Sequence, residues 1–370
     1  MLISKKSGAF AMNNKEIEIK FGVLGDPENL MQILSSTGTV TGEHIDNLSN
    51  TYFDTEDQRL FSAQAGVRIR RGNQFTEQTL KVRGENIAGI HSRGEYNIPI
   101  PADSKVPNLS LFPREAFGPD FDLEGIQAQL KPMCQIDFVR HCFDFQIMNS
   151  TFEVAYDHGG IKLADDSFYP INELEVELKE TTVNDDEIVM LFCTLATIFA
   201  ERGLPLVLEP FSKMHRATVL LKNRRNSLDF SNIYQAQTLN DYILELIKSF
   251  ERLYGLFLIK HDPLMFTYIN STLATLIKAL KQLKKSGKAA FANGEREPVN
   301  YLDDLKVIIK ILKSLYAKSS KIEEKLTKFS LAGKEEKVLE QVMYMRKIEC
   351  RYQAFLIPLK LRLLMSMLVK

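Results

Sequence analysis

Residues Glu16, Glu18 and Lys20 occupy alternating positions in the segment Glu-Ile-Glu-Ile-Lys near the start of the chain. Side chains in a β-strand repeat every two residues, so this spacing predicts a strand with its charged groups on one face and two isoleucines on the other. Two carboxylates and an ammonium in one row are costly to bury without partners. They can, however, hold a divalent cation beside a phosphate group. For one such segment alone, a solvated face on an edge strand is the simpler interpretation.

The same alternation recurs in further segments of the first 220 residues. Some predicted strands carry basic groups on their charged face, as at Arg68 and Arg70, and others carry acidic groups. A solvated sheet face usually mixes its polar residue types, so this sorting favours a closed or nearly closed barrel whose lumen holds an anion and its metal ions. The other charged positions of this kind are Lys81 and Arg83, Arg93 and Glu95, Arg140, Asp157, and Glu173, Glu175 and Glu177.

At these residues the chain resembles the CYTH superfamily, the triphosphate tunnel metalloenzymes, and most of all its two-domain bacterial inorganic triphosphatases. The resemblance covers residues 14–222. Each motif is weak alone, but their order and spacing together are specific. The matching motifs are Glu16-x-Glu18-x-Lys20, Tyr52-Phe53-Asp54-Thr55, Arg68-x-Arg70, Lys81, Glu95, Arg140, Asp157, Glu175-x-Glu177 and Ser212-Lys213.

The resemblance implies an antiparallel eight-stranded β-barrel that hydrolyses inorganic triphosphate to pyrophosphate and phosphate. In the family, glutamates of the first strand and of a late Glu-x-Glu pair bind metal. Carboxylate ligands suit Mg²⁺ or Mn²⁺ better than zinc. The implied metal ligands are Glu16, Glu18, Glu175 and Glu177, with Asp157 nearby and Glu173 as a further candidate.

The expected catalytic residues are Glu18, which would position and deprotonate the attacking water, together with Lys20 and Lys81. Guanidinium groups can bind phosphate oxygens in a bidentate manner, which an ammonium cannot do. The residues expected to bind the phosphates are Lys20, Arg68, Arg70, Lys81, Arg83, Glu95, Arg140, Lys213 and Arg216. Arg83 and Arg93 fit the rim of the tunnel equally well. For Asp54 we favour hydrogen bonds to the following turn over metal binding.

Two helical insertions are predicted within the barrel sequence, at residues 26–38 and 184–201, and residues 102–131 are predicted to be loop with one short helix. Residues 223–235 read as a linker. Helical periodicity follows at 238–260, 263–285, 301–329 and 334–369, with a polar loop at 286–300 and a break at Pro358. The predicted fold class is therefore α+β, with the barrel and its flanking helices at 14–222 and an all-α bundle at 236–370.

The 370 residues are too many for one ordinary core, which also favours two domains. No apolar run is long enough for a membrane span or a secretory signal, and Met12 could be an alternative start after an ill-ordered leader. The four cysteines lack metal-ligand spacing and read as reduced thiols. We therefore expect a cytoplasmic protein without a membrane or nucleic-acid partner.

The formal net charge of the whole chain is zero, but the charge is unevenly distributed. Residues 1–234 have a net charge of −10, and residues 235–370 have a net charge of +10. An acidic barrel that binds a polyanion needs divalent metal to offset its own carboxylates. The basic half can dock on the barrel, be solvated, or bind long-chain polyphosphate. Its place suggests a shortened or diverged CHAD-like domain, but His261 is its only histidine, and an unrelated bundle is the alternative.

Two other functions stay open. Hydrolysis of thiamine triphosphate, or cyclisation of ATP as in class IV adenylate cyclases, would need aromatic side chains to stack on an organic group. The candidates for that role are Phe53, Phe61, Phe75 and Phe211. The barrel could instead be a polyphosphate-binding module without catalysis, although the charged positions that hydrolysis needs are intact.

Overall fold

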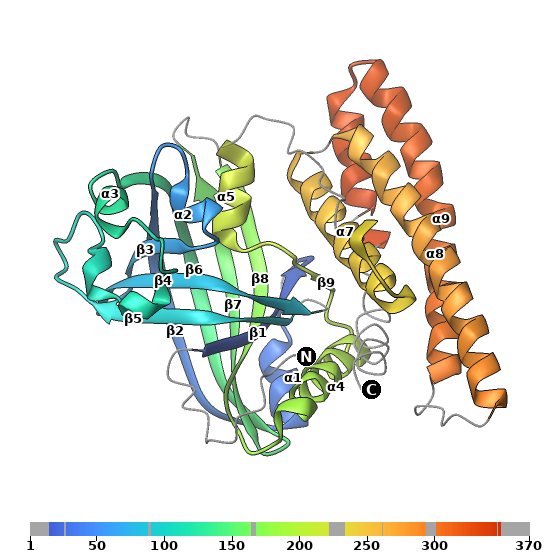
Figure 1. Cartoon of the computed structure of the whole chain (residues 1–370), viewed down its shortest axis with the longest axis horizontal. Coiled ribbons are helices and arrows are strands. Elements are labelled where there is room, and N and C mark those ends of the chain that lie inside the picture. Colours follow the sequence, from blue (N-terminus) through green and yellow to red (C-terminus); the bar gives the residue numbers. More distant parts are fainter. Residues whose placement is uncertain are drawn as a thin grey trace.

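The structure, a computed structural model, describes residues 15–25, 27–87, 90–163, 168–221, 234–260, 262–293, 301–345 and 347–348. Its first part is a closed antiparallel barrel of eight strands, and helices follow it (Figure 1). The neighbour order is β5-β4-β3-β2-β6-β7-β8-β1, and pairing of β1 with β5 closes the barrel. The strands are β1 (Lys15–Val23), β2 (Thr39–Asp54), β3 (Gly66–Arg71), β4 (Thr76–Ile87), β5 (Ile90–Pro99), β6 (Lys131–Ile147), β7 (Ser150–Lys162) and β8 (Phe168–Thr181).

The strand register brings the charged faces together inside the barrel. On one side of β1, Glu16 pairs with Arg93 of β5, and on the other side Lys20 pairs with Glu175 of β8. Paired residues in a sheet point to the same face, so a charged residue on one strand meets a charged residue on the next. The lumen is polar as a result.

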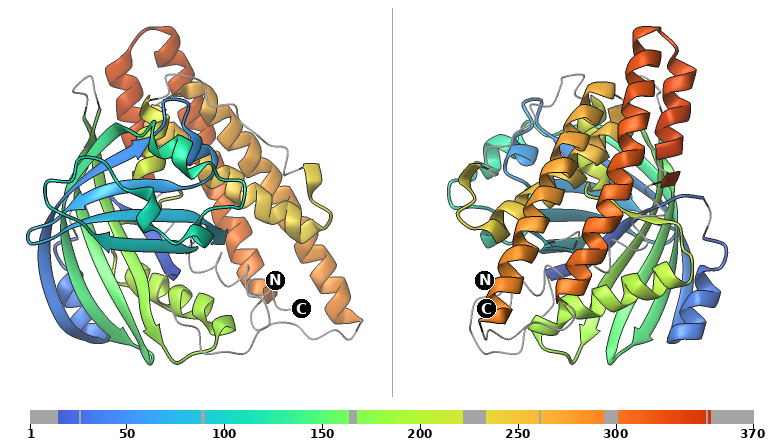
Figure 2. Two further views of the ribbon diagram at one scale, coloured as in Figure 1. Left: turned by 60° about the vertical axis from the view of Figure 1, so that its left-hand side comes forward. Right: turned by 90° about the vertical axis from the view of Figure 1, so that its right-hand side faces the viewer.

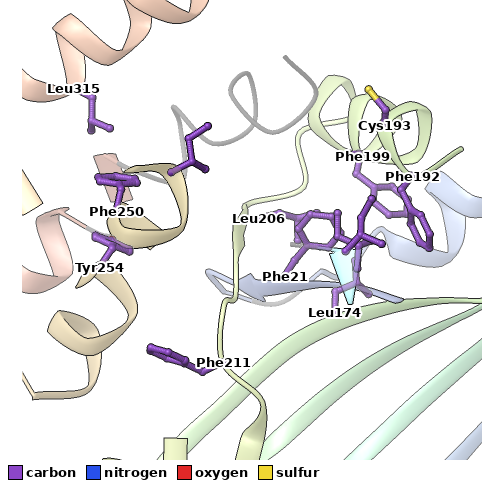
Figure 3. Close-up of a cluster of buried hydrophobic side chains, with 14 of the residues drawn as sticks. Phe21, Leu174, Phe192, Cys193, Phe199, Leu206, Phe211, Phe250, Tyr254 and Leu315 are labelled. Carbon is purple, nitrogen blue, oxygen red and sulfur yellow. The ribbon is translucent and has the colours of Figure 1, made fainter. Parts of the chain in front are cut away.

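The outer face of β1 is apolar, and helices cover it. Ile19 and Phe21 are each 1% exposed and belong to one cluster with side chains of α1 (Leu30–Thr37) and α4 (Asp185–Glu201). Figure 3 shows Phe21 beside residues of α4. The barrel therefore keeps its aliphatic core outside and its charges inside, which is the arrangement that the alternating sequence pattern predicts.

Helix α5 (Lys213–Leu221) follows the short strand β9 (Leu206–Leu208) and lies over one end of the barrel (Figure 1). Its residues Met214 and Ala217 pack against Tyr52 and Phe138 of the barrel strands. This apolar contact covers that end and directs the side chain of Lys213 into the lumen.

The C-terminal helices are α7 (Leu239–Lys260), α8 (Pro263–Ala292) and α9 (Tyr301–Leu331), with a further helical segment at 335–345. Successive helices pack together, and the views of Figure 2 show the long helices alongside the barrel. Their buried residues join the outer barrel residues in one continuous apolar cluster. Among the described helices, none combines the length and the apolar character needed to cross a bilayer.

The barrel and the α+β class are confirmed, and α4 ends at Glu201 as predicted. The predicted polar loop is wrong for residues 286–292, because α8 continues to Ala292 through Lys288, Ala289 and Ala290, all good helix formers. Between β5 and β6 the chain forms two 3₁₀ turns (Leu109–Leu111, Arg114–Ala116) and α3 (Leu123–Gln127). The predictions for the leader, His261, Pro358 and most of the linker fall outside the described residues.

Candidate active site

The barrel encloses a cavity of about 790 Å³. Side chains from all eight barrel strands and from α5 line it, because alternate residues of each strand point inward. Carboxylates and cations are interleaved around its wall. The charged lining residues include Glu16, Lys20, Arg68, Arg70, Lys81, Arg93, Glu95, Arg140, Glu153, Glu175, Glu177, Lys179 and Lys213.

The first group of charges lies where β1 meets β4 and β5. Lys81 donates to both oxygens of Glu16, at 2.9 and 3.1 Å, and Arg93 donates to Glu16 at 2.9 Å and to Glu18 at 3.0 Å. Burial opposes ionisation of Glu16, but Lys81 and Arg93 hold its pKa well below the usual value. Burial raises the pKa of Glu18, although Lys20 lies 3.1 Å away and opposes the shift. The two carboxylates of one strand therefore differ in their affinity for a proton.

The second group lies where β7 and β8 meet α5. Asp157, Glu173 and Glu175 are buried, and their oxygens approach to within 4.8 Å of one another, so they could hold a metal ion. The Nζ atom of Lys213 lies 2.7, 2.6 and 2.8 Å from these three carboxylates. Arg140 donates to Asp157 at 2.7 Å and to Glu175 at 2.6 Å. The negative charge of these three carboxylates is therefore already compensated by Lys213 and Arg140.

The two guanidinium groups of β3 that line the cavity, Arg68 and Arg70, have mainly neutral partners. Arg68 donates to Thr79 at 3.2 Å and to Tyr52 at 3.3 Å, and Arg70 donates to Asn50 at 2.9 Å. The carboxylate oxygens beside them are farther away, at 3.6 and 3.9 Å. Burial and two neighbouring guanidinium groups lower the pKa of Arg70 to about 10. This part of the cavity therefore carries positive charge that an anion would stabilise.

Glu177 borders the first group, because it pairs in register with Glu18. Burial raises its pKa to about 7, although Lys179, 2.9 Å away, opposes the shift. A carboxylate with such a pKa can exchange a proton near neutral pH.

Arg83 and Arg93 show where the sequence pattern was insufficient. A β-bulge between Lys81 and Gly84 changes the alternation of β4, and Arg83 is exposed and does not line the cavity. Arg93, which could equally have been a rim residue, binds both glutamates of β1. In the sequence, the indication that Arg93 points into the lumen was its distance of two residues from Glu95, which places both side chains on the same face of the strand.

The structure also places Glu95, Arg216 and Asp54, three further residues whose roles were predicted from the sequence. Glu95 contacts Lys81 at 2.9 Å. Arg216 is buried on α5, where it binds Glu173 and does not itself line the cavity. Asp54 accepts hydrogen bonds from the backbone N–H groups of residues 55, 60 and 61, at 2.8 to 3.0 Å, which confirms its role in the turn.

Comparison of the sequence with protein families agrees with the polar barrel. Residues 14–200, half of the chain, match the family model of the CYTH domain. The chain belongs to the CYTH family.

The chain is also similar to an individual protein of known name. An inorganic triphosphatase of Haemophilus influenzae is 32% identical over 196 residues. The match covers 51% of each protein, so the chain spans about half the length of this curated relative.

Two solved structures are similar to the chain at a low level. A Hippeastrum protein for which a dominant triphosphatase activity is described is 20% identical, with a TM-score of 0.39 over 54% of this chain and 93% of its own. A Pyrococcus horikoshii protein is 16% identical, with a TM-score of 0.35 over 56% and 99%. At these TM-scores neither similarity bears on function.

Proposed function

We propose that the barrel is a metal-dependent inorganic triphosphatase that converts tripolyphosphate to pyrophosphate and phosphate. The observation that carries this proposal is the pair Arg68, which is buried, and Arg70, which is half-buried. Their hydrogen-bond partners are neutral, and both face a cavity rich in carboxylates. A polyphosphate supplies the negative charge that these groups lack. The similarity to the Haemophilus inorganic triphosphatase supports the same substrate class.

The donor set of the cavity suits a hard cation such as Mg²⁺ or Mn²⁺, because its acidic lining residues offer carboxylate oxygens. Glu16, Glu18 and Glu177 are the residues that we assign to it. The other three carboxylates already bind the ammonium of Lys213, so they would have to release it before they could bind the cation. They are Asp157, Glu173 and Glu175. When bound, the cation neutralises charge on phosphate oxygens.

The protein's own residues provide binding and proton transfer in this proposal. Arg68 and Arg70 bind phosphate oxygens, and Lys20 on β1 and Lys81 on β4, the strand paired with β3, add positive charge to the same cavity. Glu18 accepts the proton of the attacking water, for which its raised pKa suits it better than the strongly ionised Glu16.

The alternative within the family is an organic triphosphate such as ATP or thiamine triphosphate. Of the four candidate stacking residues, Phe61 and Phe75 line the cavity. Phe53 and Phe211 do not line it and are buried in the apolar clusters. Phe61 contacts the ring of His215 edge-on, at 5.5 Å between centroids. Aromatic side chains therefore form part of the cavity lining, but charged side chains are more numerous in it.

The test compares initial rates on tripolyphosphate, ATP and thiamine triphosphate with Mg²⁺, Mn²⁺, Ca²⁺ or EDTA. The proposal expects metal-dependent turnover of tripolyphosphate well above that of the organic substrates. If unlabelled tripolyphosphate inhibits turnover of ATP or thiamine triphosphate only weakly, the organic group dominates binding and the alternative is correct. A folded protein that binds polyphosphate without turning over any substrate would be a binding module.

The helical half has a surface suited to a longer polyanion. Lys306, Lys310, Lys313 and Lys321 are all exposed on α9, and their spacing places several of them on one face. We propose that this face can bind long-chain polyphosphate. Replacing the four lysines with glutamine should weaken retention on immobilised polyphosphate and leave tripolyphosphate turnover unchanged, and unchanged retention would contradict it.

A further inference from the structure

A short loop, residues 209–212, connects β9 to α5 and touches the site from both ends. The backbone N–H of Glu209 donates to the carbonyl oxygen of Lys20, at 3.1 Å. At the other end, the hydroxyl of Ser212 accepts a hydrogen bond from the backbone N–H of His215, at 3.2 Å. The position of this loop therefore determines where α5 begins and where the side chain of Lys213 enters the lumen.

Phe211 is the apolar centre of this loop. It is 5% exposed, and its ring stacks on His215 with 4.4 Å between centroids and 7° between planes. His215 in turn contacts Phe61, and both rings line the cavity. A row of three aromatic rings thus runs from the loop to the wall of the site.

Helix α7 meets this loop at a glycine. A Cβ atom at Gly255 would lie 2.6 Å from Cε2 of Phe211 and 3.0 Å from Cγ of Pro210. These distances are shorter than ordinary carbon contacts, so the helix backbone approaches the loop as closely as a glycine permits. Figure 3 shows Phe211 near Tyr254, the residue before this glycine. Phe211 belongs to the cluster that joins the helices to the barrel.

We infer that Phe211 is a positioning residue through which helix α7 holds Lys213 in the phosphate site. Phe211 lies against Gly255 of α7 and stacks on His215 of α5, and it lies two residues from Lys213 in the chain. The C-terminal helices are thereby part of the machinery that shapes the site. The effect on activity rests on the proposed function, but the position of Lys213 does not.

The test uses the full chain with Phe211→Ala and, from the other side of the contact, Gly255→Val. Phe250→Ala is the matched control, because Phe250 is equally buried, at 5%, in the same cluster. The first readout is acetylation of Lys213 by a water-soluble acylating reagent, measured by peptide mass spectrometry. Lys20, which is also buried, serves as the internal reference for an intact barrel.

We expect Lys213 to be acetylated about tenfold faster in Phe211→Ala and Gly255→Val, with Lys20 still protected, since small shifts of a packed element are enough to misplace a side chain. The KM for tripolyphosphate should rise by a similar factor, with less change in kcat. Wild-type protection of Lys213 in a folded Phe211→Ala protein would overturn the inference, and so would equal deprotection in Phe250→Ala. An inactive wild-type protein would contradict only the proposed function, since the labelling still decides the role of Phe211.

Discussion

Arg68 and Arg70 present positive charge to the cavity from neighbouring inward-facing positions of one strand. Burying such charge is unfavourable unless a partner compensates it, and here the close hydrogen-bond partners are neutral oxygens. A bound polyphosphate would supply that compensation. At the scale of single residues, the site is thus prepared for an anion before one binds.

Arg70→Lys tests this directly. An ammonium group cannot bind two phosphate oxygens in the fork geometry of a guanidinium, so the KM for tripolyphosphate should rise about tenfold, with the fold intact. Arg71→Lys is the control, because Arg71 follows on the same strand but donates to the backbone of Ser104 instead. An unchanged KM in the Arg70 variant would remove this residue from the binding site.

Two buried thiols give a prediction about pH. Burial raises the pKa of both Cys134 and Cys142 to about 12, so neither forms the reactive thiolate at pH 9 in the folded protein. In the unfolded chain a thiol ionises near its ordinary value of 9.0. Iodoacetamide should therefore alkylate them slowly in native protein and rapidly in urea, and stability should fall as the pH rises above about 9. Rapid alkylation of the native protein at pH 9 would contradict the buried positions.

At the scale of elements, the strand pattern predicted most of the barrel lumen. The parity of Glu16, Glu18 and Lys20 was sufficient to place them inside, because period two admits only two faces. It could not decide between lumen and rim for Arg83, since a β-bulge adds a residue that no alternation reveals. The cluster around Lys213 could not be derived from strand pattern, because the ammonium arrives from a helix that covers the end of the barrel.

Helix α5 therefore has an electrostatic role that a substitution can expose. Lys213→Gln leaves Asp157, Glu173 and Glu175 without their shared ammonium, which should lower the free energy of unfolding by about 3–5 kcal/mol. The vacated cluster should then bind Mg²⁺, so thermal denaturation should show a larger Mg²⁺-induced rise in Tm than in wild type.

Lys213→Arg is the matched control, because it keeps the positive charge and should show the wild-type response to Mg²⁺. An equal rise in Tm for wild type and Lys213→Gln would mean that these three carboxylates do not bind the metal even when the ammonium is absent.

At the scale of the whole molecule, the barrel and the C-terminal helices share one apolar cluster. Phe21 and Leu174 of the barrel lie at one side of it, and Tyr254 and Leu315 of the helices at the other (Figure 3). Helical periodicity alone predicted the helices but not this contact, since amphipathic faces do not identify their partners. The opposite charge balances of the two halves, −10 and +10, also favour their association.

Truncation after residue 235 should consequently destabilise the barrel. It uncovers Phe211 and its neighbours in the shared cluster, so the fragment should unfold at a lower Tm than the full chain and bind a hydrophobic dye. Calorimetry with dye fluorescence measures both effects. A fragment with the full-length Tm and no dye binding would show that the two halves are independent.

The most direct test of the central claim is hydrolysis of tripolyphosphate by the wild-type chain and by Glu18→Gln, each with Mg²⁺. Glu18 is 1% exposed, and its loss should remove proton transfer to the carboxylate while the isosteric amide keeps the packing. The wild-type protein should release pyrophosphate and phosphate in equal amounts, and the folded variant should be at least about 10²-fold slower. No release by folded wild-type protein, or equal release by the variant, would contradict this account.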